Sequence, residues 1–375
     1  MSGVGDMEKR VLIVDFNHRA HMYMNSSFRP MVSVMINGEA KTIDTSIQNG
    51  FIKDVYRWSN GGFHPTVVCF DSPVPVRKAY FAKNFNMPVG TVAEYKGGRE
   101  KMSELFFESI TMTKNMLDKA GVTCVKANNY EADDLIFACI KKAKAQYPGM
   151  PIDVMTNDAD LIPLVDDTVS VFLRSKKGTE SESPEYERLH YVQVTPKNYQ
   201  RIVEGLSNYK KFEIPYNTLL LHKLLRGDSS DNIGGVKKRF PPKVYNSIIE
   251  QMKSDWVDLY DAFRYGENKV HYEDLEGNVI SLEKAKELGN QARVFYEDPE
   301  ELTRILDVFS RYCDDEEVLT HIRKAYLGMN LNQAYIGYGN LSRRPARISK
   351  DITGFSDIEL QRVASELSIN LNLRG

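Results

Sequence analysis

Short apolar runs that end in acidic residues constrain the fold of this chain more than any other sequence feature. The runs are rich in β-branched side chains, which is typical of strands buried in a parallel sheet. Each run is followed closely by a carboxylate. The clearest examples are residues 11–14 with Asp15, residues 66–70 with Asp71, and residues 152–155 with Asp158 and Asp160.

Amphipathic segments separate the apolar runs. Apolar residues recur at helical spacing between positions 47 and 58 and again between 102 and 117. A further short run at 122–125 precedes a helix that we expect over 131–146. Strand and helix therefore alternate along the chain. This pattern predicts an α/β fold with a doubly wound, mostly parallel sheet.

A group of acids opens the helix expected over 131–146. Glu131, Asp133 and Asp134 stand within four positions and lead into an apolar run. Taken alone, they are explained equally well by their favourable interaction with the helix dipole. Acids after several strands favour a metal site, because the carboxyl ends of parallel strands meet in one crevice. Crowded carboxylates repel one another there, and a bound cation relieves the repulsion.

The ligand types favour a hard divalent cation. Carboxylate oxygens suit Mg²⁺ or Mn²⁺, whereas zinc sites usually include cysteine or histidine. The four cysteines are scattered and form no Cys-x-x-Cys pair, so we expect free thiols and a reducing compartment. His18 and His21 lie near Asp15, and we favour hydrogen bonding over metal ligation for them. No glycine-rich phosphate loop follows the first run, which argues against a dinucleotide site.

Two basic segments predict contacts with nucleic acid, although 49 basic and 51 acidic residues nearly balance over the whole chain. Residues 77–101 combine cations with aromatic rings, as a single strand requires for its phosphates and bases. A second basic stretch follows a glycine pair. A solvated surface is the alternative explanation for each stretch taken alone. The candidate contacts are Arg77, Lys78, Lys83, Tyr95, Lys96, Arg99, Gly234, Gly235, Lys237, Lys238 and Arg239.

Six motifs carry a resemblance to a known family. They are Asp15, Phe70-Asp71, residues 94–99 (EYKGGR), 130–134 (YEADD), 156–161 (TNDADL) and 227–233 (GDSSDNI). In this order they resemble the 5′-nuclease family of 5′-3′ exonucleases and flap endonucleases, which includes bacteriophage ribonuclease H and the 5′-nuclease domain of bacterial DNA polymerase I. The resemblance implies a PIN-like fold followed by a helix-three-turn-helix, two divalent metal ions, and hydrolysis of phosphodiesters near 5′ ends and branches.

The resemblance also assigns roles to individual residues. Lys96 and Arg99 resemble the basic pair that contacts the scissile phosphate. The helix-three-turn-helix of many members binds potassium, but here Lys237, Lys238 and Arg239 replace a glycine turn, so side-chain cations are expected to take over part of the clamp and the potassium ion is in question. The predicted catalytic residues are Lys96, Arg99, Asp15, Asp71 and Asp134. The predicted metal ligands are Asp15, Asp71, Glu131, Asp133 and Asp134 in a tighter cluster, and Asp158, Asp160, Asp228 and Asp231 in a second.

The chain divides into four expected regions. They are a flexible leader at 1–10, a PIN-like α/β nuclease domain at 11–194 with an arch at 77–101, a helix-three-turn-helix at 195–255, and a mainly helical region and tail at 256–375. The tail is a candidate docking site for a sliding clamp or single-strand binding protein, and a plain C-terminal helix is the alternative. No signal peptide or membrane span is evident, so we expect no membrane contact. The resemblance implies a monomer in the cytoplasm of a bacterium or a phage-infected cell.

These features together predict a Mg²⁺-dependent, structure-specific 5′-nuclease that acts on DNA with 5′ flaps or on RNA–DNA hybrids. Its expected role is the removal of RNA primers and flaps in DNA replication or repair. Two alternatives stay open: a PIN-type ribonuclease that acts on single-stranded RNA, and a non-catalytic protein that binds DNA junctions.

Overall fold

The computed structural model divides into two compact units. Unit 1 consists of Met1–Pro73, Glu100–Pro196 and Ala346–Gly375, and unit 2 of Val74–Arg99 and Lys197–Pro345. The structure describes the whole chain except residues 1–7, 26–29, 37–38, 73–75, 86, 88–94, 98–103, 175–190, 207–208, 210–211, 237–241, 244, 248, 254–269, 297–302, 304–305, 308, 312–314, 330–345, 347, 370 and 372–375.

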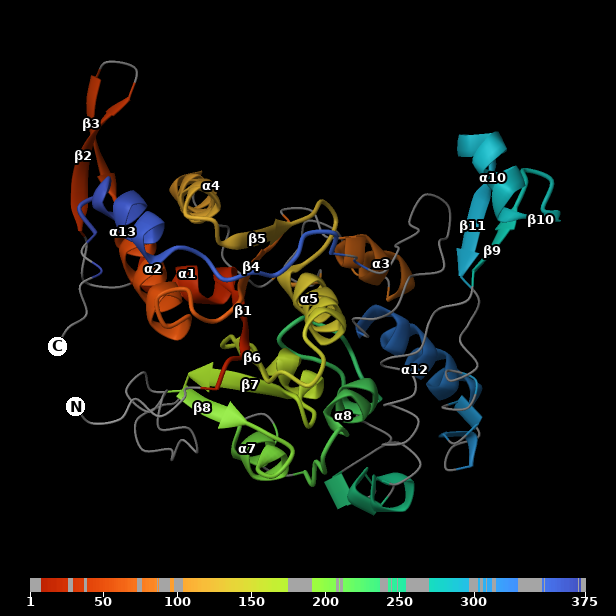
Figure 1. Cartoon of the computed structure of the whole chain (residues 1–375). Helices are drawn as coiled ribbons and strands as arrows, with labels where there is room; N and C mark the ends of the chain where they lie inside the picture. Colours follow the sequence, from red (N-terminus) through yellow and green to blue (C-terminus); the bar gives the residue numbers. More distant parts are fainter. Residues whose placement is uncertain are drawn as a thin grey trace. The chain divides into compact units, whose positions relative to one another are not determined.

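Unit 1 is built on a six-stranded sheet in the order β5-β4-β1-β6-β7-β8 (Figure 1). All neighbouring strands pair in parallel except β7 and β8, which are antiparallel. The predicted doubly wound, mostly parallel sheet is confirmed. The strands are β1 (Val11–Asp15), β4 (Thr66–Phe70), β5 (Thr123–Lys126), β6 (Ile152–Met155), β7 (Val169–Arg174) and β8 (Tyr191–Val194).

The border between β1 and β6 is the point at which the strand order reverses. The chain places β4 and β5 on one side of β1 and then returns to place β6 and β7 on the other. Val14 pairs with Val68 of β4 and with Met155 of β6, so β1 is buried between the two halves. In doubly wound sheets, ligands bind beyond the carboxyl ends of the strands at this switch point.

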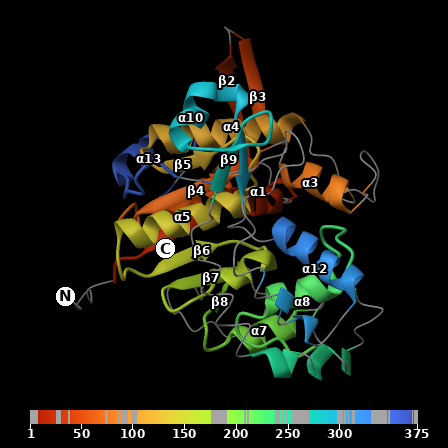
Figure 2. The same cartoon turned by 90° about the vertical axis from the view of Figure 1, so that its right-hand side faces the viewer.

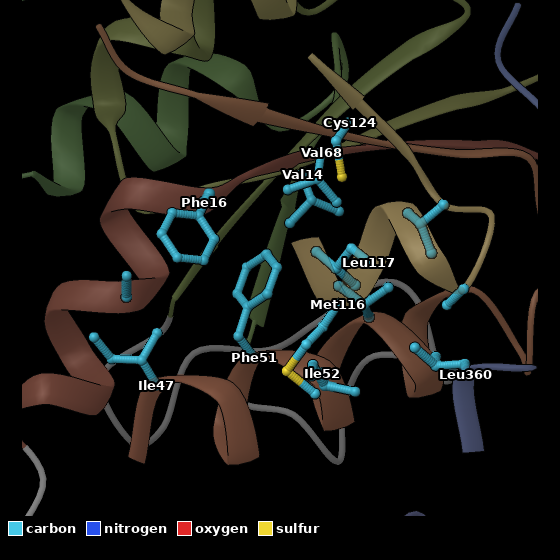
Figure 3. Close-up of a cluster of buried hydrophobic side chains, with 14 of the residues drawn as sticks. Val14, Phe16, Ile47, Phe51, Ile52, Val68, Met116, Leu117, Cys124 and Leu360 are labelled. Carbon is cyan, nitrogen blue, oxygen red and sulfur yellow. The ribbon is translucent and has the colours of Figure 1, made fainter. Parts of the chain in front are cut away.

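Helices cover both faces of the sheet. Leu12 and Val14 of β1 face an apolar core shared with four helices, whose side chains Figure 3 shows turned toward one another. Helix α5 (Ala132–Gln146) packs against β1 and β4 from the other face, and Figure 2 shows β4 between α4 and α5. The four helices of the first face are α1 (Phe16–Met24), α2 (Ser46–Trp58), α4 (Glu104–Lys119) and α13 (Asp357–Ser365).

The C-terminal segment of the chain returns to unit 1. The Thr66 amide at the start of β4 donates to the Thr353 carbonyl at 3.0 Å, and Tyr147 at the end of α5 donates to the Ile352 carbonyl at 2.6 Å. Leu360 of α13 is fully buried in the core shared with α2 and α4. The described part of the segment therefore completes the hydrophobic core of unit 1.

Unit 2 has its own apolar core. Helices α3 (Val76–Asn84) and α8 (Leu219–Arg226) both pack against α12 (Glu316–Met329) and bury Phe81, Leu224 and Tyr326. Further helical elements are α7 (Tyr199–Gly205) and α10 (Leu282–Leu288) in unit 2, with the short 3₁₀ segments η1 (Ala159–Leu164) in unit 1 and η2 (Gly289–Gln291) in unit 2.

Two small antiparallel sheets were not predicted from the sequence. One is the hairpin of β2 (Met31–Ile36) and β3 (Glu39–Asp44) in unit 1. The other lies in unit 2, in the region expected to be mainly helical, and joins β9 (Val270–Glu273), β10 (Val279–Ile280) and β11 (Arg293–Tyr296). Among the described residues, no helix has the length and hydrophobicity to cross a membrane.

We predict that the C-terminal helix contributes strongly to the stability of unit 1. Leu360→Ala should lower the free energy of unfolding by about 2–5 kcal/mol, because it leaves a cavity in the core. The matched control is Ile358→Ala on the same helix, where the side chain is 76% exposed and the change should stay within about 0.5 kcal/mol. Urea unfolding measures both. Equal effects at the two positions would show that α13 does not pack as described.

We also predict that His222 of α8 makes unit 2 sensitive to acid. Burial, followed by the charges of Arg226 and Lys223, lowers the pKa of His222 to about 3. The unfolded chain takes up a proton near the ordinary pKa of about 6.5, so stability is lost as the pH falls between these values, by about 2 kcal/mol from pH 7 to pH 5. His222→Phe should remove this pH-dependent loss of stability, because a phenyl ring suits the surrounding rings of Tyr209, Phe212 and Tyr245. Urea unfolding at pH 7 and at pH 5 measures the free energy of unfolding of both proteins. A variant that loses as much stability as the wild type between these pH values would contradict the prediction.

Candidate active site

Asp15 stands at the carboxyl end of β1, next to the switch point. Its side chain caps α1, where Oδ1 accepts the His18 amide at 3.5 Å, and Oδ2 accepts the Thr156 hydroxyl at 2.8 Å. The carboxyl is fully buried, and burial raises its pKa, although the charge of His18 and the hydrogen bond from Thr156 oppose the shift. Additional positive charge nearby, such as a bound cation would supply, would favour the ionised form of Asp15.

The end of β6 meets Asp15 across the switch point. Thr156 follows β6 directly and joins the two strand ends, because its hydroxyl donates to Asp15 and accepts the Asp158 amide at 3.0 Å. Asp158 in turn accepts the Asp160 amide at 2.9 Å, which starts the turn of η1. Two of the acid positions predicted from strand ends are thus connected by hydrogen bonds at the predicted crevice.

His18 lies among these acids and carries positive charge there. Its Nε2 is 3.0 Å from Asp158 Oδ2. Burial alone would lower the pKa of His18, but the hydrogen bond to Asp158 and the charges of Asp15, Asp158 and Asp133 raise it to about 10. The predicted hydrogen-bonding role of His18 is confirmed. His21 points elsewhere and stacks on Phe106, with ring centroids 4.8 Å apart.

Asp71 and the acids of α5 occupy the neighbouring end of β4. Asp71 Oδ1 accepts the Ala132 amide at 2.6 Å, and its own amide donates to Asn17 at 3.3 Å. Glu131 and Asp134 form a capping box in which the Glu131 amide donates to Asp134 at 3.0 Å. These acids therefore satisfy helix-start amides, as the dipole interpretation requires, and also lie at the crevice edge of the sheet.

The donor set of unit 1 fits a hard divalent cation. Every predicted ligand there offers a carboxylate oxygen, which is the chemistry that Mg²⁺ and Mn²⁺ prefer. Taken by itself, the described part of unit 1 has no three such ligand atoms within 4.8 Å of one another. Asp71 and Asp134 each accept a backbone amide through one carboxylate oxygen.

Asp228 shapes the candidate helix-three-turn-helix in unit 2. The turn begins at Gly227, whose φ of 77° suits glycine, and closes through two 2.8 Å backbone hydrogen bonds between Asp228 and Ile233. The Asp228 carboxylate pairs with the Lys223 ammonium at 2.7 Å, and both side chains are buried. Burial disfavours the charge of Asp228, but Lys223 and the hydrogen bonds from Ser230 outweigh it and lower the pKa of Asp228.

Lys96 is attached to this turn within unit 2. Its amide donates to the Asp231 carbonyl at 3.3 Å, and its ammonium lies 3.9 Å from the Asp231 carboxylate. Tyr95, which was predicted to contact nucleic acid, is 2% exposed and stacks on Phe81. The sequence showed the cations and rings of this segment but not which of the rings would be buried.

The other predicted contacts differ in exposure. On α3, Arg77 is buried, Lys78 is half-buried and Lys83 is exposed, and at the turn Gly234 is exposed. Gly235 comes so close to the preceding helix that a Cβ there would lie 2.0 Å from the Arg226 carbonyl carbon. Four of the predicted contacts lie outside the described residues, namely Arg99, Lys237, Lys238 and Arg239. Sequence reasoning placed Thr156 in a motif without giving it a role, and it did not identify Asn17. Only the positions of these residues, close to the acids at the strand ends, could have indicated their roles.

Comparison with known proteins agrees with this arrangement. Residues 11–191, which cover five strands of the unit 1 sheet and reach the first residue of β8, match the model of the family described as 5′-3′ exonuclease, N-terminal resolvase-like domain. This segment belongs to the 5′-3′ exonuclease family. The exonuclease segment holds all the predicted acids of unit 1 and the described part of the 77–101 arch.

Curated relatives of the exonuclease segment are DNA polymerases. DNA polymerase I of Lactococcus lactis subsp. cremoris is 33% identical over 169 residues, which cover 44% of this chain and 17% of the relative. The thermostable DNA polymerase I of Thermus filiformis is 29% identical over 241 residues, which cover 63% of this chain and 23% of the relative. The matches thus span less than a quarter of these relatives' length.

Solved structures show a weaker likeness. The T5 D15 protein co-crystallized with metal ions is 16% identical with a TM-score of 0.46, over 86% of this chain and 100% of that chain. The catalytic core of Rad2 in complex with DNA substrate is 12% identical with a TM-score of 0.44, over 96% of this chain and 88% of that chain. At TM-scores below 0.5, these likenesses carry no further argument.

We predict that Lys223 stabilises unit 2 by neutralising a buried charge. Lys223→Met leaves Asp228 buried without its cation and should lower the free energy of unfolding by about 3 kcal/mol at neutral pH. Lys197→Met, at an exposed lysine of the same unit, is the control and should change it by less than about 0.5 kcal/mol. Urea unfolding in EDTA separates the two, and a loss below about 1 kcal/mol for Lys223→Met would contradict a buried pair.

Proposed function

We propose that this protein is a divalent-metal-dependent, structure-specific 5′-nuclease that hydrolyses phosphodiesters near 5′ ends and branches of DNA. The observation that carries the proposal is the row of acids at the carboxyl ends of β1, β4 and β6, within a segment of the 5′-3′ exonuclease family. Membership of the family supports the reaction class. The charges of the crevice support the need for a metal.

Carboxylates of unit 1 would hold the ions. The proposed ligands of the tighter cluster are Asp15, Asp71, Glu131, Asp133 and Asp134. A second cluster would include Asp158 and Asp160. The proposed metal is Mg²⁺, with Mn²⁺ as a substitute. Asp228 and Asp231 remain predicted ligands from the resemblance alone. When bound, divalent ions supply an activated water and stabilise charge on the attacking and leaving oxygens.

The other residues of the exonuclease segment orient these groups. Thr156 holds Asp15 by a hydrogen bond, and His18 holds Asp158 in the same way. The positive charge of His18 reduces the repulsion among Asp15, Asp133 and Asp158. Lys96 is the proposed cation at the scissile phosphate, because an ammonium there stabilises the negative charge that grows during hydrolysis.

Unit 2 supplies the proposed contacts to the nucleic acid backbone. Gly234 and the turn from Asp228 to Ile233 present backbone groups, and the exposed Lys83 of α3 presents a cation. The relatives are DNA polymerases, which supports DNA as the substrate. We further propose that the substrates include RNA–DNA hybrids, so that RNA primers and flaps are removed during replication or repair.

Cleavage of a duplex with a 5′-labelled flap tests the proposal. Wild-type protein should cut near the junction with Mg²⁺ and not with EDTA. Asp134→Asn should lower the rate at least about a hundredfold, because the amide keeps the size and hydrogen bonding of the helix cap but loses the charge that holds a metal. Asp167→Asn, at an exposed acid of the same unit, is the control and should cut normally.

The flap should be offered in DNA and RNA versions, beside single-stranded RNA of the same sequence. Cleavage of the single-stranded RNA alone would favour the PIN-type ribonuclease. Tight binding of the flap without cutting in Mg²⁺ or Mn²⁺ would favour a non-catalytic junction-binding protein. Either outcome would overturn the proposed function.

A further inference from the structure

Helix α12 touches the helix that leads into the arch. Both α3 and α12 belong to unit 2, but α12 lies beyond residues 11–191, which match the exonuclease family. The Tyr80 hydroxyl of α3 donates to the Lys324 carbonyl of α12 at 3.0 Å. One turn further along α12, Gly328 leaves room for the ring of Phe81, because a Cβ at Gly328 would lie 2.4 Å from Phe81 Cζ.

Phe81 also stacks on Tyr95 and so connects it to α12. The two rings are nearly parallel, at 16°, with centroids 4.9 Å apart. Both side chains are buried, and a buried stacked pair fixes the position of each ring more closely than an aliphatic contact. A displacement of Phe81 away from α12 would therefore displace Tyr95.

Tyr95 directly precedes Lys96, whose backbone is unusual. Lys96 has a φ of 58°, the left-handed region that non-glycine residues rarely adopt. Its amide is hydrogen-bonded to the Asp231 carbonyl, and its ammonium lies 5.1 Å from the centre of the Tyr95 ring. Such a conformation persists only where surrounding contacts enforce it, and strained residues gather at functional sites.

We propose that Gly328 is a positioning residue for Lys96, acting through Phe81 and Tyr95. Because Gly328 has no side chain, Phe81 packs directly against α12. Phe81 in turn fixes the position of Tyr95. Contacts with Tyr95 and Asp231 then hold Lys96 in its left-handed conformation. The inference rests on the proposed function, in which Lys96 stabilises the scissile phosphate. It assigns to α12, outside the matched exonuclease segment, a part in setting the cleavage rate.

The size of the effect follows from the geometry of phosphate contact. A cation stabilises a developing charge only when it is placed to within a fraction of an ångström, and a misplacement of about 1 Å costs up to about a hundredfold in rate. A methyl group at Gly328 must push Phe81 outward, since the present distance is shorter than carbon atoms tolerate. We expect part of that displacement to reach Lys96.

The test compares Gly328→Ala with Gly205→Ala in the full chain. Gly205 ends α7 in the same unit, is exposed, and has no atom within 4 Å of the place that a Cβ would take, so its substitution should be neutral. Gly328→Ala should lower the single-turnover rate of flap cleavage in Mg²⁺ about tenfold, with little change in flap binding in EDTA. Amide hydrogen exchange at Lys96, measured without DNA or metal, should become faster in Gly328→Ala only.

A double-mutant cycle separates positioning from a general structural effect. In a Lys96→Ala background, Gly328→Ala should cause no further loss of rate, because the residue it positions is absent. A full additional loss in that background, or unchanged exchange at Lys96, would overturn the inference. If Gly328→Ala does not fold, Phe81→Leu replaces it, because it keeps an apolar side chain while removing the stacked ring, with the same expectations.

Failure of this inference can be told apart from failure of the proposed function. A wild-type protein that cuts no flap overturns the proposed function and with it the role of Lys96 in cleavage. A wild-type protein that cuts normally, with Gly328→Ala as fast as Gly205→Ala, overturns the inference alone.

Discussion

Mutual repulsion among carboxylates is the constraint on which the rest of unit 1 depends. The register of β1 between β4 and β6 brings acids to adjacent strand ends, where they would disperse if nothing opposed their charge. The fold opposes it with hydrogen bonds from Thr156 to Asp15 and from Ala132 to Asp71, and with the positive charge of His18. Each of these groups comes from an element packed on the same sheet. A sheet with helices on both faces therefore holds these acids at neighbouring strand ends, where we propose that they bind divalent cations.

Much of this arrangement follows from the sequence, for a physical reason. A strand buried on both faces is mostly apolar, so β1, β4 and β6 stand out as short runs, and the acids after them mark the carboxyl ends. Asp153 within β6 is the exception, and its buried carboxylate is paired with Arg10. The hairpin of β2 and β3 and the small sheet of β9 to β11 lack this signal. Their strands are short or partly exposed, and exposed strands such as the one holding Met31, 55% accessible, need not be apolar or alternate in a regular way.

The candidate site was predictable in its acids but not in the groups that orient them. Asp15, Asp71 and Asp158 are recognisable because carboxylates at strand ends are unusual without a ligand. Thr156 and Asn17 are ordinary polar residues whose role depends on distances that span more than 50 positions in sequence. Tyr95 shows the converse difficulty. An aromatic ring beside cations suits base stacking, but only the packing of Phe81 shows that this ring lies inside unit 2.

The role of the C-terminal part of the chain could not be predicted from its sequence, for a related reason. Its residues act by filling space rather than by chemistry: Leu360 fills the core of unit 1, while Tyr326 and Gly328 fit the core of unit 2. Apolar residues at helical spacing specify that a helix packs, but not what it packs against. A glycine that admits a neighbouring ring is least visible of all, since its contribution is the absence of a side chain. Residues outside the acid motifs can therefore govern the site's geometry while carrying none of its chemical signature.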